Sequence, residues 1–525
     1  MEDLTNDLKE GQRNLSRTKN AKKGIIAGFF NKIVTLLIPF IVRTVLIKEI
    51  GIEYAGLNSL FISILQVLNL AELGFSNAMV FSMYEPIAKR NDESICALLN
   101  FYRKVYKIIG IGILGVGIIL IPFLPNLING TPPDGINIII IYLVFLLNTS
   151  ISYLLYGYKT SLLNAYQRTD VISNIGSVTT LGLNISQICL LYIIPNYYIY
   201  VVFMPFFTIA NNLIVSYVVD RMYPQYSCRG SISNEQRKDI AKRVSGLAIQ
   251  RVCYMVRNNM ASIFLSMFLG LSIVAVYNNY NMIQSAFTGI LSIITSSILA
   301  GVGNSLQTQT KDANLHSMKK FNFLYIWISG FAAITLACIF QPFMELWMGK
   351  NYMLPLSSAL LFCLYFFNTK MGDIYSIYFS AAGLWWYGRW MFIFEVVLNL
   401  GLDLWLINIW GVNGILIGTI IAHFIISLMY GTYLLFKFCF SYKSLVSFYG
   451  QQLFYLLISI VVFISTYWIC LKVDSFIQIK NLFITLFIRI VVCAIIVNTL
   501  YLLFYYKLKE FSVSTKWLIT NVLKK

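Results

Sequence analysis

Long apolar segments alternate with short polar stretches along all 525 residues of the chain. A membrane-spanning helix needs about 20 apolar residues, because the hydrocarbon core of a bilayer is about 30 Å thick. The pattern therefore predicts fourteen such helices and an all-α polytopic membrane protein. Their approximate ranges are 24–46, 57–81, 105–126, 137–158, 171–194, 198–219, 244–268, 272–301, 321–341, 354–380, 390–409, 412–436, 446–470 and 481–506.

The seventh predicted helix is the least apolar, because Arg251, Arg257 and Asn258 interrupt it. The distribution of Lys and Arg favours it nevertheless. With all fourteen helices, most of the 40 Lys and Arg residues fall on one side, which identifies that side as cytoplasmic. Without the seventh helix, Lys319 and Lys320 would move to the outside. Both termini are therefore predicted to be cytoplasmic.

A faint internal repeat predicts how the helices are grouped. When position 32 is superposed on position 251, Gly51 falls on Gly270 and Asn31 on Gln250. Paired six-helix halves are a recurring transporter plan. The predicted parts are a cytoplasmic N-terminal tail (1–23), a first six-helix lobe (24–219), a basic cytoplasmic linker (220–243), a second six-helix lobe (244–436), two additional helices (446–506) and a cytoplasmic C-terminal tail (507–525).

Composition excludes several classes of protein. Hydrophobic residues make up 58% of the chain and charged residues only 12%, about half the charged fraction of a soluble protein. The net charge of +18 lies in short loops, so it indicates membrane topology and no nucleic-acid partner. The nine cysteines are scattered singly and there are two histidines, so neither a metal centre nor a disulfide is predicted.

Basic residues inside the predicted helices are the first candidates for a binding site. A charge near the middle of a membrane span is costly and usually functional. Lys32 and Arg43 lie about 20° apart on one helix face, and Arg251 shares a face with Asn258. Arg257 points about 120° away from Arg251. If these faces point inward, a cation-lined cavity lies between the two lobes.

Each of these basic residues could instead have a structural role. Arg43 is close enough to its helix end to snorkel towards the interface. Lys32 is near the predicted level of Glu72, so the two form an ion pair in the alternative interpretation. Glu72 itself belongs to a polar stripe, which either lines a cavity with Asn31 or joins helices.

Two carboxylates in the eleventh helix are candidates for ion coupling. Glu395 and Asp403 share one broad face with Asn399. A deeply buried carboxylate can carry a coupling proton or help to hold sodium. The alternative is that these groups form hydrogen bonds between helices. No other cofactor is predicted.

Several sequence stretches resemble bacterial polysaccharide flippases of the Wzx type. These belong to the multidrug, oligosaccharidyl-lipid and polysaccharide exporter superfamily. The stretches are IGIEYAGLNSLF, NLAELGFSNAMVFSMYEPIA, VAVYNNYNMI, AGVGNSL, ELWMGKNY and NLGLDLWLINIWGVNGILIGTII. Each is weak singly, but together they cover nearly the whole chain.

The resemblance implies a fourteen-helix, two-lobed transporter in the bacterial plasma membrane. Such a protein moves an undecaprenyl-diphosphate-linked oligosaccharide, such as an O-antigen repeat unit, from the inner to the outer leaflet by alternating access. Lys32, Arg43, Arg251 and Arg257 are the matching candidates for binding the diphosphate. Many relatives have an acidic residue where this chain has Ala261, so a role for that acid does not carry over.

The alternatives belong to other functional classes. A diphosphate carries about two negative charges, which suits a cationic cavity. A multidrug exporter of the same superfamily generally takes cationic drugs and needs carboxylates, which Glu72, Glu395 and Asp403 would supply. An enzyme is not predicted, because the outer loops are too short for a catalytic domain. The expected partners are the lipid-linked oligosaccharide, the bilayer, and a polysaccharide polymerase with its chain-length proteins.

Overall fold

The computed structural model describes residues 37–69, 75–477 and 481–520, and every regular element within them is a helix. This confirms the predicted all-α fold. The chain consists of two compact units, each with most of its contacts inside itself. The first comprises Met1–Met255 and Gly270–Ala275, and the second comprises Val256–Leu269 and Val276–Lys525. The division falls inside the helix Asn234–Leu269, whereas the predicted linker covers 220–243.

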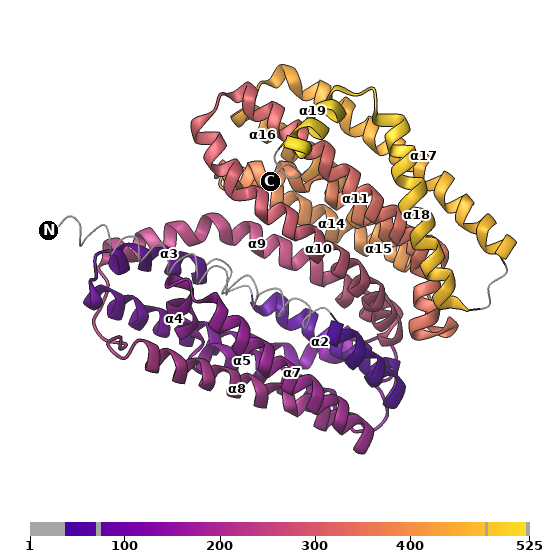
Figure 1. The fold of residues 1–525 in the computed structure, drawn as a ribbon. Coiled ribbons are helices and arrows are strands. Elements are labelled where there is room, and N and C mark those ends of the chain that lie inside the picture. Colours follow the sequence, from indigo (N-terminus) through magenta and orange to yellow (C-terminus); the bar gives the residue numbers. More distant parts are fainter. Residues whose placement is uncertain (1–36, 70–74, 478–480, 521–525) are drawn as a thin grey trace. The chain divides into compact units, whose positions relative to one another are not determined.

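The first unit begins with helical residues 37–49 and continues through seven α-helices (Figure 1). Side chains of asparagine cap several of them, as Asn91, Asn137 and Asn196 accept hydrogen bonds from the first backbone N–H groups. The helices are α2 (Ile52–Leu68), α3 (Phe75–Ala88), α4 (Asp92–Leu120), α5 (Ile138–Leu154), α6 (Thr160–Ala165), α7 (Thr169–Ile193) and α8 (Tyr197–Met222), with short 3₁₀ helices at Ile121–Leu127 and Gly157–Lys159.

The second unit holds most of α10, part of α9 and all the later helices (Figure 1). A π-helical segment, His423–Tyr430, lies between α15 and α16. The helices are α9 (Asn234–Leu269), α10 (Leu271–Thr308), α11 (Lys311–Met348), α12 (Leu356–Met371), α13 (Asp373–Ala381), α14 (Arg389–Trp410), α15 (Val412–Ala422), α16 (Gly431–Cys439), α17 (Leu445–Ile477), α18 (Leu482–Tyr505) and α19 (Lys509–Leu518).

Ten helices of the described residues are long and apolar enough to cross a membrane, or eleven with the bent pair Ile138–Leu154 and Gly157–Ala165. These correspond to eleven of the fourteen predicted spans. The seventh span is among them, as Ala248–Leu269. Predicted spans 24–46 and 57–81 run into residues outside the described ranges, and 354–380 breaks at Gly372 between α12 and α13. The total of fourteen therefore stays a prediction.

A glycine permits one close helix contact in the first unit. A Cβ on Gly56 of α2 would lie 2.0 Å from the backbone oxygen of Leu271, at the start of α10. Only glycine leaves room for that approach, because real Cβ contacts are never so short. The residue before Leu271 is Gly270, whose φ of 86° is a conformation that glycine adopts without strain. Two glycines thus allow the chain to turn into α10 directly against α2.

Aromatic residues attach α17 and α18 to α11 in the second unit. Phe323 and Trp327 of α11 pack edge-on against Tyr505 and Tyr501 of α18, and Tyr455 of α17 lies against the same rings. The three tyrosines and Phe323 are buried in one core. Edge-to-face contacts between such rings stabilise the packing of these helices. The last two predicted spans are therefore firmly packed against the rest of their unit.

Candidate functional site

A ladder of polar side chains runs down one face of α14. Glu395, Asn399 and Asp403 are spaced by four residues, so they project from the same side of the helix. All three are buried, and Asn399 and Asp403 have no exposed surface. Polar groups buried in an apolar surrounding need partners inside the protein. The neighbouring helix supplies most of them.

The matching face belongs to α15 and the π-helical segment that follows it. Only Gly411 separates α14 from α15, so the two helices run antiparallel and their residues pair in reverse order. Ser427 Oγ donates to Glu395 Oε2 at 2.9 Å. Asn399 Nδ2 donates to Thr419 Oγ1 at 3.1 Å and to Asp403 Oδ2 at 3.1 Å. The π-helical turn begins at His423, within this ladder, and such turns occur frequently at functional sites.

Glu395 is the centre of a charged cluster. Arg257 of α9 forms an ion pair with it through Nη1 and Oε1, and both side chains are at most 10% exposed. His423 Nδ1 lies 3.0 Å from Glu395 Oε1 and 3.2 Å from Arg257 Nη1. These contacts compensate the buried carboxylate, which would otherwise be expensive to desolvate. The cluster brings together two residues predicted for different roles, diphosphate binding and ion coupling.

Asp403 has a different environment from Glu395. No ion pair to Asp403 is present among the described residues. In the same ranges, Asp403 Oδ1 and the neighbouring Asn399 Oδ1 are buried without a hydrogen-bond partner. Oxygen atoms without donors are the ligands that a hard cation such as sodium prefers, and a proton on the Asp403 carboxylate would also compensate its charge. Of the two predicted coupling residues, Asp403 is therefore the one left without a compensating charge.

Arg43 is hydrogen bonded within the first unit. Its Nη1 donates to Ser59 Oγ at 2.9 Å and to the backbone oxygen of Ala55 at 3.4 Å. Its Nη2 donates to the backbone oxygen of Ala275 at 3.0 Å. The guanidinium thus joins three segments of this unit, which gives it a structural role. Its predicted part in diphosphate binding stays a prediction.

The remaining predicted residues fall into two groups. Arg251 is half-buried on α9, and Asn258 is exposed on the same helix. Asn31, Lys32 and Glu72 lie outside the described residues, as does the predicted ion pair of Lys32 with Glu72. Their predicted roles stay predictions.

His423 and Ser427 are not among the site residues predicted from the sequence. Thr419, His423 and Ser427 repeat at the same spacing of four residues as the acidic ladder on α14. Two such ladders on consecutive helices, joined by a single glycine, indicate that the polar faces meet. The sequence therefore carried a signal for this pairing, although not for the third partner, Arg257.

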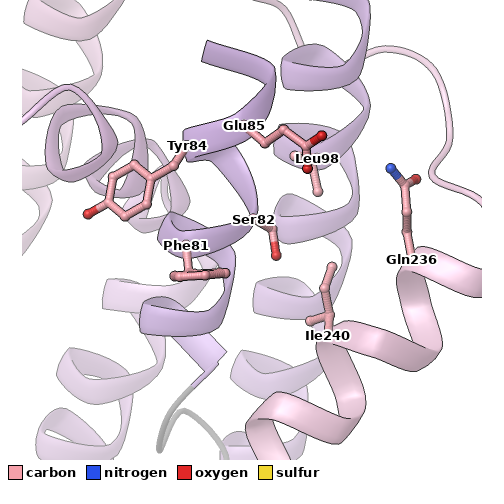
Figure 2. Close-up of a pocket in the computed structure, with 7 residues that line it drawn as sticks. All are labelled: Phe81, Ser82, Tyr84, Glu85, Leu98, Gln236 and Ile240. Carbon is pink, nitrogen blue, oxygen red and sulfur yellow. The ribbon is translucent and has the colours of Figure 1, made fainter. Parts of the chain in front are cut away.

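A separate pocket of the first unit contains none of these residues. It has a volume of about 340 Å³ and lies between α3, α4 and α9, as Figure 2 shows. Its polar groups are the side chains of Ser82, Glu85 and Gln236. The wall is otherwise apolar and aromatic, from Phe81, Tyr84, Leu98 and Ile240.

Comparison with known proteins identifies the family. The model of the family described as polysaccharide biosynthesis protein matches residues 21–300, more than half of the chain. The chain belongs to this family. No curated protein gives a significant match to the sequence.

Solved structures share the fold of this polysaccharide biosynthesis family member. A lipid II flippase, MurJ, in an inward closed conformation is 15% identical, with a TM-score of 0.66 over 92% of this chain and 99% of the other. An inward-facing multidrug resistance MATE transporter of the MOP superfamily is 14% identical, with a TM-score of 0.61 over 77% and 94%. A point mutant of the Vibrio cholerae MATE transporter VcmN is 15% identical, with a TM-score of 0.54 over 82% and 98%.

Family and fold together support the resemblance found in the sequence. The chain is a multi-pass membrane protein of a polysaccharide biosynthesis family, with the fold of transporters and flippases. Family and fold both agree with the prediction of a transporter and not an enzyme. The assignment to the Wzx type is a finer statement and stays a prediction.

Gly418 of α15 gives a direct test of the packing around Asp403. A Cβ at this position would lie 2.4 Å from Asp403 Oδ1, whereas a Cβ on Gly401 of α14 would meet nothing within 4 Å. We expect Gly418→Ala to destabilise the protein by about 1–3 kcal/mol, because it overpacks the buried ladder. Gly401→Ala is the matched control and should be neutral or slightly stabilising. Equal unfolding temperatures of the two purified variants would contradict the described packing.

The Arg257 and Glu395 pair predicts a non-additive effect on stability. Removing one partner leaves the other charge buried, so Arg257→Met alone should cost about 3–5 kcal/mol. The double variant Arg257→Met with Glu395→Met removes both charges and should be clearly more stable than either single variant. Thermal unfolding of the detergent-purified proteins measures this difference. Additive losses would show that the two residues do not interact.

Proposed function

We propose that this protein is a flippase for lipid-linked oligosaccharides in surface polysaccharide biosynthesis. It would move undecaprenyl-diphosphate-linked repeat units from the inner to the outer leaflet by alternating access around a cationic cavity. The observation that carries this proposal is the family match over residues 21–300. The shared fold with a lipid II flippase supports it, because that protein handles a lipid-linked substrate.

Electrostatics supports a substrate with a negative head group. The basic residues Lys32, Arg43, Arg251 and Arg257 all lie in apolar segments of the chain. A diphosphate is stabilised strongly by basic side chains that are shielded from water. The observed contacts make two of these candidates less available to a substrate. Glu395 neutralises Arg257, and Arg43 donates hydrogen bonds to Ser59 and to backbone oxygens. Arg251 is therefore the preferred diphosphate ligand among the described residues.

We place ion coupling at Asp403 and assign Glu395 to the positioning of Arg257 and His423. Glu395 is already compensated by Arg257, so loading a proton or sodium there would break an existing ion pair. Asp403 has no such partner among the described residues, and a cation beside it would satisfy its free oxygen. Binding of the ion would then shift the conformational equilibrium that alternating access requires.

The proposed cellular setting follows from the same function. The protein would lie in the bacterial plasma membrane with both termini in the cytoplasm, where lipid-linked repeat units are completed. A polymerase and chain-length proteins would take up the flipped units on the outer side. A multidrug exporter is the rival function, since transporters of that class share the fold.

Deletion of the gene tests the proposed function against its rival. We expect the lipid-linked repeat unit to accumulate on the inner leaflet and surface polysaccharide to fall, because no other step clears that intermediate. The lipid-linked pool is measured in isolated membranes, and its sidedness is measured with an impermeant label. Unchanged pools with altered drug resistance would favour the multidrug exporter.

Variants of Arg251 then test the diphosphate site in the same strain. Losing one charge-assisted contact costs about 1.5–3 kcal/mol, so Arg251→Ala should reduce flipping by roughly 10-fold to 150-fold at equal protein levels. Arg251→Lys keeps the charge and should recover part of the activity. Val256→Ala, about 140° around the same helix from Arg251, is the control for helix perturbation. Normal polysaccharide in Arg251→Ala cells would exclude this residue as the ligand.

Asp403→Asn tests the coupling proposal in proteoliposomes. Allosteric coupling between two ligands is typically about 5-fold to 150-fold, and the variant should lose the stimulation of flipping by an imposed sodium or proton gradient. Asp373→Asn is the matched control, because Asp373 already contacts Lys370 at 2.8 Å and Tyr325 at 2.5 Å. Gradient stimulation that persists in Asp403→Asn would overturn the assignment.

A further inference from the structure

Three cysteines on different helices meet inside the second unit. Cys338 lies on α11, Cys470 on α17 and Cys493 on α18, and their sulfur atoms are all within 4.8 Å of one another. Each of the three side chains is fully buried. Among the described residues, this is the one group of three or more cysteine, histidine or carboxylate side chains that converges closely enough to hold a metal ion. No such centre is predicted from the sequence, because each cysteine stands alone in the chain.

An arginine and a carboxylate lie one helical turn from the thiols. Arg489 precedes Cys493 by four residues on α18, and its Nη1 donates to the backbone oxygen of Cys338 at 2.5 Å. Asp474 follows Cys470 by four residues on α17 and forms an ion pair with Arg489. The ion pair thus joins α17 and α18 one helical turn from the thiols, and Arg489 extends this link to the backbone of α11.

A cavity opens beside this cluster, between the same three helices. It has a volume of about 210 Å³ and is lined by Glu345 of α11, Asp474 of α17 and Arg489 of α18. The positive charge of Arg489 is offset by Asp474, and Glu345 forms an ion pair with Lys350 at 3.4 Å. The polar wall of this cavity, one turn from the buried thiols, gives a cation an entry path.

The three sulfurs have a spacing that fits one soft metal ion. With metal–sulfur bonds of about 2.3 Å, a trigonal arrangement places the sulfurs roughly 4 Å apart. Thiolate ligands select Cu(I) and Zn²⁺, and structural Zn²⁺ almost always takes four ligands. Three cysteines therefore favour Cu(I).

We propose that Cys338, Cys470 and Cys493 form a trigonal thiolate site for a soft d¹⁰ cation, Cu(I) in particular. The site would connect α17 and α18 to α11, several helical turns away from the cluster of Tyr501 and Tyr505. Binding replaces the thiol protons by the metal, and no electron transfer takes place. The proposal does not depend on the flippase function, because it concerns different helices from the polar ladder.

Metal titration of the full-length protein tests this proposal. The purified protein is reduced, stripped of metal and titrated anaerobically with Cu(I) against a chromophoric competitor, and separately with Zn²⁺. We expect one high-affinity Cu(I) per chain, together with a rise in unfolding temperature on binding. Preferred binding of Zn²⁺ through the same cysteines would overturn the assignment to Cu(I) and identify Zn²⁺ as the occupant of the site.

Single variants show whether the three cysteines are the ligands. Cys338→Ser, Cys470→Ser and Cys493→Ser should each weaken metal binding by roughly 100-fold or more, since loss of a ligand exceeds the usual effect of outer-shell changes. Cys363→Ser is the matched control, because Cys363 is also buried in this unit but lies outside the group. The metal-free unfolding temperature of every variant is measured in parallel.

X-ray absorption of the metal-loaded wild-type protein gives a measurement that needs no variant. It should record three sulfur neighbours at about 2.2–2.3 Å from the metal. The proposal is overturned if neither metal binds at one per chain, or if binding is unchanged in all three serine variants. A disulfide between two of the three cysteines in protein isolated without reductant would also overturn it.

Discussion

The buried carboxylate of Glu395 is the interaction on which the second unit depends most. A charge in an apolar surrounding is tolerated only with compensating partners, and here Arg257, His423 and Ser427 supply them. These partners come from α9 and from the segment after α15. The carboxylate therefore ties α9, α14 and the π-helical segment into one arrangement. Moving α9 away from α14 would leave two unpaired charges, and moving the π-helical segment would remove two hydrogen-bond partners of Glu395.

The same constraint separates the two acidic residues of α14 into different roles. Glu395 and Asp403 are eight residues apart on one helix face, and by sequence they are equivalent candidates. Glu395 meets a guanidinium, whereas Asp403 accepts a hydrogen bond from the uncharged amide of Asn399. A carboxylate that is paired with a cationic side chain stabilises the packing of its helices. A carboxylate without such a partner is suited to take up and release a cation. This difference arises from which helix packs beside each end of α14.

A basic residue in a membrane protein can either form hydrogen bonds and ion pairs within the protein or bind a charged substrate. From their charge, Arg43 and Arg257 are predicted to bind the diphosphate. In the structure, both have several partners within their own units. A substrate that recruits such an arginine must replace contacts of similar strength. A residue with fewer internal contacts is easier for a substrate to recruit. Arg251 ranks above the other two because it forms no ion pair within the described ranges.

The sequence by itself determined the fold class, eleven of the membrane spans and the sharing of helix faces. These depend on the length of apolar segments and on the helical repeat, which are local properties of the chain. Glu395, Asn399 and Asp403 lie on one face, as predicted, for this reason. Only the tertiary structure decided which helices meet. The pairing of Arg257 with Glu395 and the approach of Cys338 to Cys470 and Cys493 each join residues more than a hundred positions apart. Such contacts depend on how side chains of different helices fill space together, and no periodicity within one helix specifies that.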